Sequence, residues 1–295
     1  MVVTREHSGP VLVIGATGRV GRLVVDELLR AGVTVRALTR RPEQAALPVD
    51  AELVVGDLTA PASLDVPLDG VRAVFLVWTA PIATASDVIA RLATSTSGES
   101  RRIVHLSSPH QTPHPFFQQP NALRAVHAEL ERLLAAATRD LVILRPGMFA
   151  SNALFWWAPQ IRNGNAVRWP YGAAETAPVD ERDVAAVATR ALLDDRHVGG
   201  DYVLTGPESL SQAAQVHAIG DAIGRPIRFE ELSPDEFRRE TAATWPDAVT
   251  EMLLGAWHAT LGHRAYVTSV IDDIVGSPAR TFFQWAADNA ALFER

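Results

Sequence analysis

The stretch Val11-Leu12-Val13-Ile14-Gly15-Ala16-Thr17-Gly18-Arg19-Val20-Gly21 joins an apolar run to a glycine-rich segment. The apolar run is typical of a buried strand, and apolar residues then recur at helical spacing as far as Ala31, before Gly32 at the position of a C-cap glycine. A strand, a glycine turn and a helix start bring unpaired backbone N–H groups to one point, where the helix dipole favours an anion. Glycine permits both the turn and the close approach of a pyrophosphate. The segment predicts a dinucleotide site that includes Gly15, Thr17, Gly18, Arg19, Val20 and Gly21.

The next strand indicates which dinucleotide binds. Residues 33–38 alternate as a strand that ends in Thr39-Arg40-Arg41. An NAD site usually carries an Asp or Glu about 20 residues past the glycines, for the ribose 2′-hydroxyl, whereas here two arginines stand at the strand end. A guanidinium can hold a 2′-phosphate through bidentate, charge-assisted hydrogen bonds. We therefore predict NADP(H), with Arg40 as the main phosphate ligand and Arg19 or Arg41 assisting; the alternative is that Arg40 and Arg41 are ordinary surface charges.

Composition narrows the class of protein. The chain has 295 residues, a net charge of −7 and no cysteine, which excludes disulfides and zinc–thiolate sites and argues against a nucleic-acid surface. No apolar stretch reaches the length of a membrane helix, and residues 1–10 lack the pattern of a signal peptide. His110 and His114 form a proline-interrupted pair without a nearby third ligand, so no metal is expected. We expect a cytoplasmic protein that acts on a small molecule and on neither nucleic acid nor membrane.

Strands alternate with helices along the first half of the chain. Further apolar strands are predicted at 52–57, 73–78, 102–107 and 141–145, and helices at 61–68, 83–94 and 121–138. This alternation predicts the α/β class, a Rossmann doubly wound parallel sheet with helices on both faces. From residue 151 the sequence becomes helix-rich and aromatic, with one short strand near 201–205. We predict an NADP(H)-binding domain at 1–150 and a substrate-binding region at 151–295, packed on the carboxyl edge of the sheet rather than folding independently.

At the level of motifs, the chain resembles the NmrA-like group of the atypical short-chain dehydrogenase/reductase superfamily over essentially its whole length. The motifs that carry the resemblance are residues 15–21, Arg40, 56–58, 77–79, 144–149, 180–185, 204–208 and 276–282. The resemblance implies a Rossmann fold that binds NADP(H), with Asp57 and Leu58 at the adenine. It also implies that Trp78, Thr79 and Ser107 approach the ribose and nicotinamide, and that Val77, at the same strand end, contacts the cofactor. Gly147, Met148 and Phe149 would lie on the far side of the nicotinamide.

The catalytic pair of the usual carbonyl reductases is missing. Those enzymes carry Tyr-x-x-x-Lys on the helix after the fifth strand, where the Tyr protonates the developing alkoxide. Here Leu123 stands at the Tyr position and His127 at the Lys position, and the chain's three tyrosines lie well beyond this helix.

His127 and Ser107 remain as catalytic candidates, and both are also predicted to contact the cofactor. Glu131, one turn after His127, could orient the imidazole. The alternatives are a surface His beside a Glu, and turn hydrogen bonds from Ser107 and Ser108 after the strand.

Aromatic residues after the sixth strand predict a substrate pocket. On one continuous helix, the adjacent Trp156 and Trp157 would diverge by about 100°, so we expect only one of them to face the core. The predicted substrate-binding residues are Phe149, Asn152, Trp156, Trp157, Trp169 and Tyr171. The proline-rich segment 109–120 is either a lid over the substrate or a rigid loop packed down by Phe116 and Phe117. The alternative is that the aromatic rings only join the two regions.

These observations predict an NADPH-dependent reductase without the Tyr–Lys pair. Its acceptor would be an electrophile that needs little acid assistance: a quinone, enone, iminium or cyclic oxocarbenium, of aromatic or polyketide type. The first alternative is a non-catalytic NADP(H)-binding redox sensor that acts through a protein partner, as the resemblance also allows. A third is epimerase chemistry on a nucleotide-sugar-like substrate.

Overall fold

The computed structural model describes residues 9–94, 100–119 and 122–294. Residues 1–8, which make up most of the segment examined for a signal peptide, lie outside the described residues, as does Pro120 at the end of the proline-rich segment. The chain forms two compact units that are not contiguous in sequence. The first comprises Met1–Ser108, Ala125–Arg145 and Val184–Tyr202; the second comprises Pro109–Arg124, Pro146–Asp183 and Val203–Arg295. Residues 109–124, 146–150 and 184–202 thus lie on the other side of the expected 150/151 boundary. The functions assigned to the two regions stay predictions.

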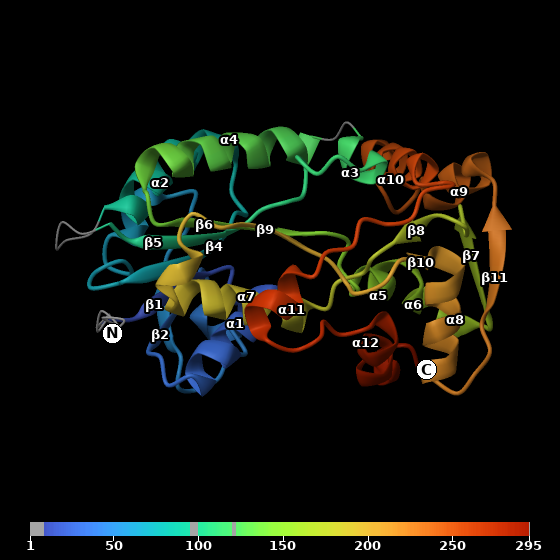
Figure 1. Cartoon of the computed structure of the whole chain (residues 1–295), viewed down its shortest axis with the longest axis horizontal. Coiled ribbons are helices and arrows are strands. Elements are labelled where there is room, and N and C mark those ends of the chain that lie inside the picture. Colours follow the sequence, from blue (N-terminus) through green and yellow to red (C-terminus); the bar gives the residue numbers. More distant parts are fainter. Residues whose placement is uncertain (1–8, 95–99, 120–121, 295) are drawn as a thin grey trace. The chain divides into compact units, whose positions relative to one another are not determined.

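A seven-stranded sheet forms the centre of the first unit (Figure 1), in the order β3-β2-β1-β4-β5-β6-β9. The strands are β1 (Val11–Ile14), β2 (Val35–Thr39), β3 (Glu52–Val55), β4 (Ala73–Val77), β5 (Arg102–Leu106), β6 (Leu141–Pro146) and β9 (Asp201–Leu204). Neighbours from β3 to β6 pair in parallel. The first six strands follow the Rossmann order, so the predicted fold class is confirmed, and the strand expected near 201–205 is the seventh.

Helices cover both faces of this sheet because its strands are apolar on both sides. Helices α2 (Ala85–Ala93) and α4 (Ala122–Ala137) lie on one face, and α1 (Arg19–Arg30) and α7 (Glu181–Leu193) on the other (Figure 1). All four residues of β1 are buried, and α1 buries Val20, Val24, Val25 and Leu28. The helical spacing read from the sequence therefore reflects packing against the sheet.

The helix expected at 61–68 is only a 3-10 turn, η2 (Pro61–Leu64). Pro67 has no N–H to continue a helix, and the carbonyls that follow bond to a buried guanidinium instead: Arg101 donates to Leu68 O at 3.2 Å and to Val71 O at 2.9 Å. The other 3-10 turns are η1 (Pro42–Gln44), η3 (Ile82–Thr84), η4 (Asp195–His197) and η5 (Ala290–Leu292).

The described residues of the second unit form helices and also four short strands. Its helices are α3 (Pro115–Gln118), α5 (Asn152–Trp156), α6 (Ala158–Asn163), α8 (Gln212–Ala222), α9 (Pro234–Thr241), α10 (Asp247–Ala259), α11 (Val270–Val275) and α12 (Phe282–Asp288). Strand β7 (Ala166–Pro170) pairs in parallel with β11 (Arg228–Leu232), and β8 (Glu175–Thr176) pairs antiparallel with β10 (Leu210–Ser211). Sequence reasoning missed these strands because they are short and their partners lie far away in the chain.

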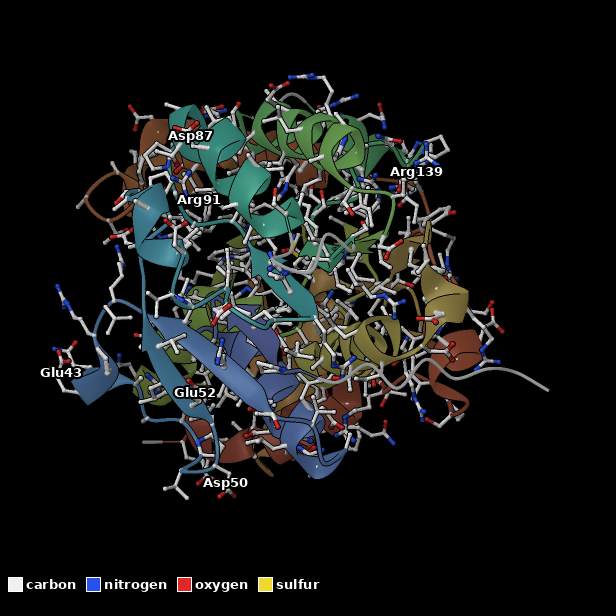
Figure 2. The ribbon with its side chains drawn as sticks, turned by 90° about the vertical axis from the view of Figure 1, so that its left-hand side faces the viewer. Glu43, Asp50, Glu52, Asp87, Arg91 and Arg139 are labelled. Carbon is white, nitrogen blue, oxygen red and sulfur yellow. The ribbon has the colours of Figure 1, made fainter. Side chains whose placement is uncertain are left out.

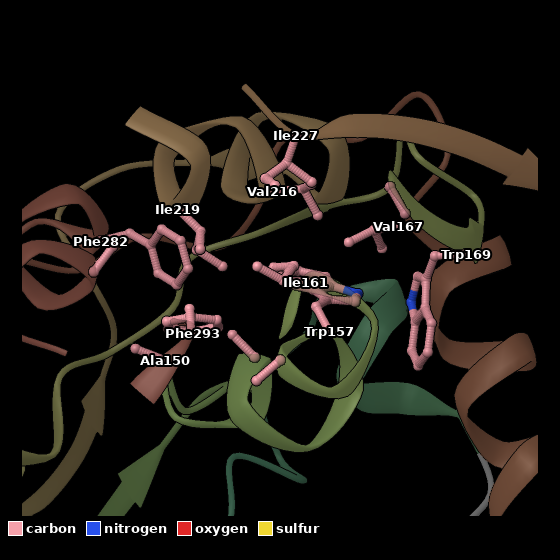
Figure 3. Packing of buried hydrophobic residues seen from close by; sticks show 14 of the residues in the cluster. Ala150, Trp157, Ile161, Val167, Trp169, Val216, Ile219, Ile227, Phe282 and Phe293 are labelled. Carbon is pink, nitrogen blue, oxygen red and sulfur yellow. The ribbon is translucent and has the colours of Figure 1, made fainter. Parts of the chain in front are cut away.

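A separate aromatic core holds the second unit together. Trp157, Ile161, Val216, Ile219 and Phe282 converge between α6, α8 and α12 (Figure 3), and each is at most 1% exposed. Burial of such side chains stabilises a fold by about 1.5–3 kcal/mol each. This core therefore gives the second unit apolar packing of its own.

Charged side chains lie on the outer surface of the first unit (Figure 2), among them Glu52, Arg91 and Arg139. Arg36 pairs with Glu52 at 2.8 Å and Arg91 with Asp65 at 3.0 Å. Pairs that water reaches in this way contribute at most about 1 kcal/mol. Among the described residues, no helix is long and apolar enough to cross a membrane.

Candidate functional site

A cleft opens in the first unit at the carboxyl ends of β1 to β4. Its volume is about 520 Å³. Its lining residues are Ile14, Gly15, Thr17, Gly18, Leu38, Thr39, Arg40, Arg41, Gln44, Gly56, Asp57, Leu58, Thr59, Val77, Thr79 and Ala80. In doubly wound sheets this edge is where ligands bind, and the volume lies within the range of ligand pockets, about 300–1,000 Å³.

The glycine turn leaves the start of α1 open to a ligand. Gly18 is the N-cap and makes no side-chain capping bond, and the first turn contains no acidic residue. The first backbone N–H groups of a helix have no partner within it, so they can bind an anion. Gly15 has a φ of +85°, and a Cβ on Gly21 would lie 2.1 Å from Gly15 O. The turn thus requires glycine at both positions, and its geometry fits a pyrophosphate.

The end of β2 contributes two cations to the same cleft. Arg40 and Arg41 are both exposed, and Arg41 is held locally, since its N–H donates to Thr39 Oγ1 at 3.1 Å and its guanidinium to Gln44 Oε1 at 3.4 Å. Among the described lining residues, none from β2 or the turn after it is acidic. The chemistry of this wall fits a 2′-phosphate better than a 2′-hydroxyl.

Asp57 is the acidic residue that lines the cleft, at the end of β3. Its Oδ1 accepts a hydrogen bond from Thr59 N at 2.8 Å, and its own N–H donates to Ser63 Oγ at 2.9 Å. The hydrogen bond from the Thr59 backbone, together with the positive charge of Arg40, lowers the pKa of Asp57 below its usual value. Asp57 is therefore a fixed, ionised acceptor; its placement at the adenine stays a prediction.

Some of the predicted cofactor residues line the cleft, and others do not. Those in the cleft are Gly15, Thr17, Gly18, Arg40, Arg41, Asp57, Leu58, Val77 and Thr79. Trp78, by contrast, packs on the hydrophobic core of the first unit and donates from Nε1 to Ala80 O at 2.6 Å. Val20 and Gly21 are buried in α1. Sequence reasoning missed Thr39, Gly56 and Ala80, which the ends of the expected strands could have indicated.

Ser107 belongs to a buried polar network rather than to an open strand end. Its hydroxyl donates to Glu131 Oε1. Both oxygens of Glu131 also accept from Arg145, at 2.7 and 2.9 Å. Arg145 in turn bonds to Asp201 at 2.5 and 3.0 Å. Burial disfavours the charge of Arg145, but the hydrogen bonds to Asp201 and Glu131 outweigh it and raise the pKa.

His127 stands beside a second histidine inside the first unit. Its ring centroid lies 6.1 Å from that of His105 on β5. His105 is completely buried, with Nδ1 3.2 Å from Leu76 O and no hydrogen-bond partner for Nε2 within the described chain. Burial, followed by the charge of His127, lowers the pKa of His105 to about 4. His105 is thus neutral at physiological pH, and the roles of Ser107 and His127 stay predictions.

This buried histidine predicts a loss of stability in mild acid. His105 has a pKa lowered to about 4 from the ordinary value of 6.5, so between these values the unfolded chain binds the proton first. The stability that neutral His105 contributes to the folded state is fully present above pH 6.5 and is lost as the pH falls toward 4. From pH 7 to pH 5, the free energy of unfolding is expected to fall by about 2 kcal/mol through this group.

Urea unfolding of the native protein and of His105→Leu, at both pH values, measures this contribution. All other titrating groups are common to the two proteins, so the difference between their pH-dependent losses isolates residue 105. An equal loss in both proteins would contradict the prediction.

The predicted substrate residues lie mainly in the aromatic core of the second unit. Trp157 is fully buried and Trp169 is 3% exposed (Figure 3). The expectation that only one of Trp156 and Trp157 faces a core is wrong, because both rings contact the same cluster. Helix α5 ends at Trp156, and the backbone bends at Trp157 (φ −118°, ψ −29°), so the 100° spacing of a continuous helix does not apply.

The remaining substrate candidates are less buried. Asn152 donates to Met148 Sδ, and Phe149 forms an isolated bridge with Val179. Tyr171 packs on the aromatic core and has a φ of +55°. A substrate role for these residues stays a prediction.

Comparison with known proteins agrees with this geometry. The family model for NAD(P)H-binding proteins matches residues 15–195. A (4-alkanoyl-5-oxo-2,5-dihydrofuran-3-yl)methyl phosphate reductase of Streptomyces griseus is 38% identical, over 96% of this chain and 99% of its own length. An NAD(P)H azoreductase of Xenophilus azovorans is 29% identical, over 96% and 99%.

Among solved structures, the triphenylmethane reductase of a Citrobacter species in complex with NADP(H) superposes with a TM-score of 0.79. It shares 18% identity, and the match covers 95% of this chain and 99% of its own length. A likeness at this identity supports the Rossmann fold. The family to which the chain belongs is assigned from the family match and from the more similar reductase sequences. The chain belongs to the NAD(P)H-binding family and is an oxidoreductase.

Proposed function

We propose that this protein is an NADPH-dependent reductase that transfers hydride to an already electrophilic small molecule, and that its acceptor is an enone. The single observation that carries the cofactor part is the cleft at the end of β1 to β4. There the uncapped start of α1 and the guanidinium groups of Arg40 and Arg41 line one cavity. When bound, NADPH supplies the hydride.

The missing Tyr–Lys pair restricts the acceptor. Residues 123 and 127 are Leu and His, and a positioned proton donor typically accelerates a reaction by about 100-fold to 10,000-fold. An acceptor that forms a stabilised anion needs less of this help. A carbon–carbon double bond conjugated to two carbonyl groups has this property, because negative charge arriving at the distant carbon is shared by both carbonyl oxygens.

The printed substrate of the Streptomyces relative contains such a bond. A 4-alkanoyl-5-oxo-2,5-dihydrofuran has its ring double bond conjugated to the ring carbonyl and to the alkanoyl carbonyl. We propose that this chain reduces a double bond of that kind. Hydride adds to the carbon distant from the carbonyls, the electron pair moves onto their oxygens, and water returns a proton to the carbon between them.

Ser107 suits a positioning role better than proton transfer. Its proton is engaged with Glu131, so its oxygen can accept a hydrogen bond but does not readily give a proton. We propose that it accepts from a hydroxyl group of the bound cofactor. His127, which lies next to neutral His105, is the second polar group proposed there.

Calorimetric titration with NADPH, NADP⁺ and NADH, followed by turnover assays, tests the proposal. We expect NADPH to bind tighter than NADH by a factor of about 100, because each charge-assisted bond to the 2′-phosphate contributes roughly 1.5–3 kcal/mol. NADPH consumption should then depend on an added 2-acylbutenolide, with quinones and cyclic imines as comparison acceptors.

Other results of these measurements would favour other functions. A strong preference for NADP⁺ without turnover would favour a redox sensor, since a ligand shifts a conformational equilibrium only through differential affinity. If only quinones were reduced, the enone would be wrong as the acceptor, whereas the reductase activity would be supported. No binding of any dinucleotide would contradict both.

A further inference from the structure

Arg22, on helix α1, joins two walls of the cofactor cleft in the first unit. Its guanidinium donates to the backbone oxygen of Ala46 and, at 3.3 Å, to that of Thr17. Thr17 lies in the glycine turn, and Ala46 lies in the segment that follows β2. Arg22 itself is not one of the residues that line the cleft. The side chain therefore connects parts of the cleft and does not form its surface.

The start of α1 decides where this guanidinium lies. The N–H of Arg22 donates to Gly18 O at 3.0 Å, which places residue 22 one turn after the N-cap. Helical side chains point back toward the N-terminus, so the side chain of Arg22 returns along α1 to the glycine turn. A guanidinium carries five N–H donors in a rigid fork, so it can bond to two carbonyl oxygens at once. The local geometry thus suits a clamp on two separate segments of backbone.

The segment after β2, residues 42–50, has few other attachments to the first unit. Ala45 is its one buried side chain, and Glu43 and Asp50 lie exposed at the outer surface (Figure 2). The hydrogen bonds from its own backbone N–H groups reach back only two or three residues. Among the described residues, the bond from Arg22 is the one hydrogen bond that ties this segment to another element. Its position therefore depends on that guanidinium.

The same segment supports the wall that is predicted to hold the 2′-phosphate. Gln44 lines the cleft beside Arg40 and Arg41, and its Oε1 accepts from the Arg41 guanidinium at 3.4 Å. The backbone oxygen of Gln44 also accepts from Ala46 N at 3.1 Å. The residue that Arg22 anchors is thus bonded directly to a residue of the wall. A shift of the segment would move Gln44 and Arg41 relative to the glycine turn.

We propose that Arg22 is a positioning residue for NADP(H), which sets the separation between the glycine turn and the arginines at the end of β2. The proposal rests on the proposed function, because it takes NADP(H) as the ligand of the cleft. The pyrophosphate and the 2′-phosphate are attached to the same ribose, so their two binding sites must keep a matching separation. A site that holds this separation before binding loses less free energy to ordering. NADH lacks the 2′-phosphate, so the clamp acts on NADPH selectively.

A plain electrostatic role for Arg22 leads to a different expectation. Both cofactors contain the pyrophosphate, so a positive charge near the glycine turn would favour NADPH and NADH alike. In the structure, both terminal nitrogens of Arg22 are bonded to backbone carbonyl oxygens. The ratio of the NADPH and NADH affinities therefore distinguishes a positioning role from a general effect of charge.

Calorimetric titration of native protein, Arg22→Met and Arg22→Lys with NADPH and with NADH measures this ratio. Arg22→Met should weaken NADPH binding by roughly tenfold and NADH binding by less than about twofold. Arg22→Lys should lose nearly as much NADPH affinity, because an ammonium keeps the charge but has no rigid fork to hold two carbonyls. An equal loss for both cofactors in Arg22→Met, or native affinities in Arg22→Lys, would overturn the proposal.

Arg30→Met is the matched control on the same helix. Arg30 pairs with Glu27, and their side chains are 63% and 35% exposed. The substitution removes the same charge from α1 without touching the cleft, so both affinities should stay at their native values.

The double variant Arg22→Met with Arg40→Ala distinguishes positioning from direct contact. If Arg22 acts through the wall that carries Arg40, the double variant should bind NADPH within about threefold of Arg40→Ala alone. If Arg22 bonded to the cofactor phosphate itself, the two losses would multiply. Losses that multiply would thus contradict the positioning role.

Hydrogen exchange of the free protein tests the clamp without any cofactor. The backbone N–H groups of residues 42–50 should exchange faster in Arg22→Met than in native protein, because their segment has lost its anchor. Those of β1 and β4 should keep their native rates, as should residues 42–50 in Arg30→Met. Equal exchange of this segment in native protein and Arg22→Met would overturn the clamp.

The native protein shows whether the inference or the proposed function has failed. If native protein prefers NADPH and Arg22→Met keeps the full preference, the cofactor part of the proposed function is supported and the positioning role is wrong. If native protein binds NADPH no tighter than NADH, the predicted cofactor is wrong, and the role of Arg22 in selectivity is overturned with it.

Discussion

The substitution Arg145→Met is expected to lower the free energy of unfolding by about 3–5 kcal/mol. Arg145 is 3% exposed and holds both oxygens of Glu131, whose side chain is 8% exposed. Without the guanidinium, Glu131 keeps its bond from Ser107 but loses the charge that compensates its own inside the first unit. Methionine has a similar length, so the loss measures the charge more than the packing. The midpoint and slope of urea unfolding report the change.

An exposed ion pair on α4, the helix that also carries Glu131, is the matched control. Arg132 bonds to Glu129 at 2.7 and 2.8 Å, but the two side chains are 65% and 41% exposed. Arg132→Met should cost less than about 1 kcal/mol, because water already solvates both charges. The double substitution Glu131→Leu with Arg145→Met should cost less than the sum of the single changes. Equal costs for Arg145→Met and Arg132→Met would contradict the assigned role of the buried pair.

The substitution Arg40→Ala is expected to weaken NADPH binding by about tenfold to a hundredfold and to change NADH binding by less than about twofold. The difference arises because only NADPH has a 2′-phosphate for the guanidinium to hold. The NADPH affinity of Arg40→Lys should lie between those of the native protein and Arg40→Ala, since an ammonium keeps the charge but not the bidentate geometry. Calorimetry with both cofactors measures the ratio directly.

Arg139, exposed on the first unit (Figure 2), provides the control. Arg139→Ala removes the same charge outside the cleft and should leave both affinities as they are in the native protein. A parallel loss for NADPH and NADH in Arg40→Ala would assign Arg40 to cofactor binding in general. No loss would make Arg40 and Arg41 ordinary surface charges, the alternative that the sequence left open.

Local patterns predicted the first unit well because its strands are apolar throughout and its helices pack on them. The buried run 11–14, the helix after it and Gly32, with a φ of +72°, all occupy the expected places. The strand end at Arg40 and Arg41 follows from the same pattern, since β2 ends at Thr39. These features are decided by residues that are close in the sequence, and the spacing of apolar residues reports on such local relations.

Sequence patterns were a weaker guide where long-range contacts decide the outcome. Glu131 was a candidate for orienting His127, yet it accepts from Ser107 and from Arg145 on β6. Likewise, Trp157 reaches the same core as Trp156 because the helix breaks between them. Arg22 belongs to none of the motifs that the sequence indicated. No spacing rule connects it with Ala46, although its guanidinium donates to the backbone oxygen of that residue.

The amino-acid sequence by itself determined the Rossmann sheet, the glycine turn at α1 and the class of cofactor, a nicotinamide dinucleotide. Each rests on residues that are adjacent or one helical turn apart, so burial and backbone geometry act on them locally. Only the tertiary structure decided which polar groups are paired and which histidine is neutral. Those properties depend on burial and on contacts between residues more than a hundred positions apart, such as His114 and Arg264, and such distances are closed only when the chain folds.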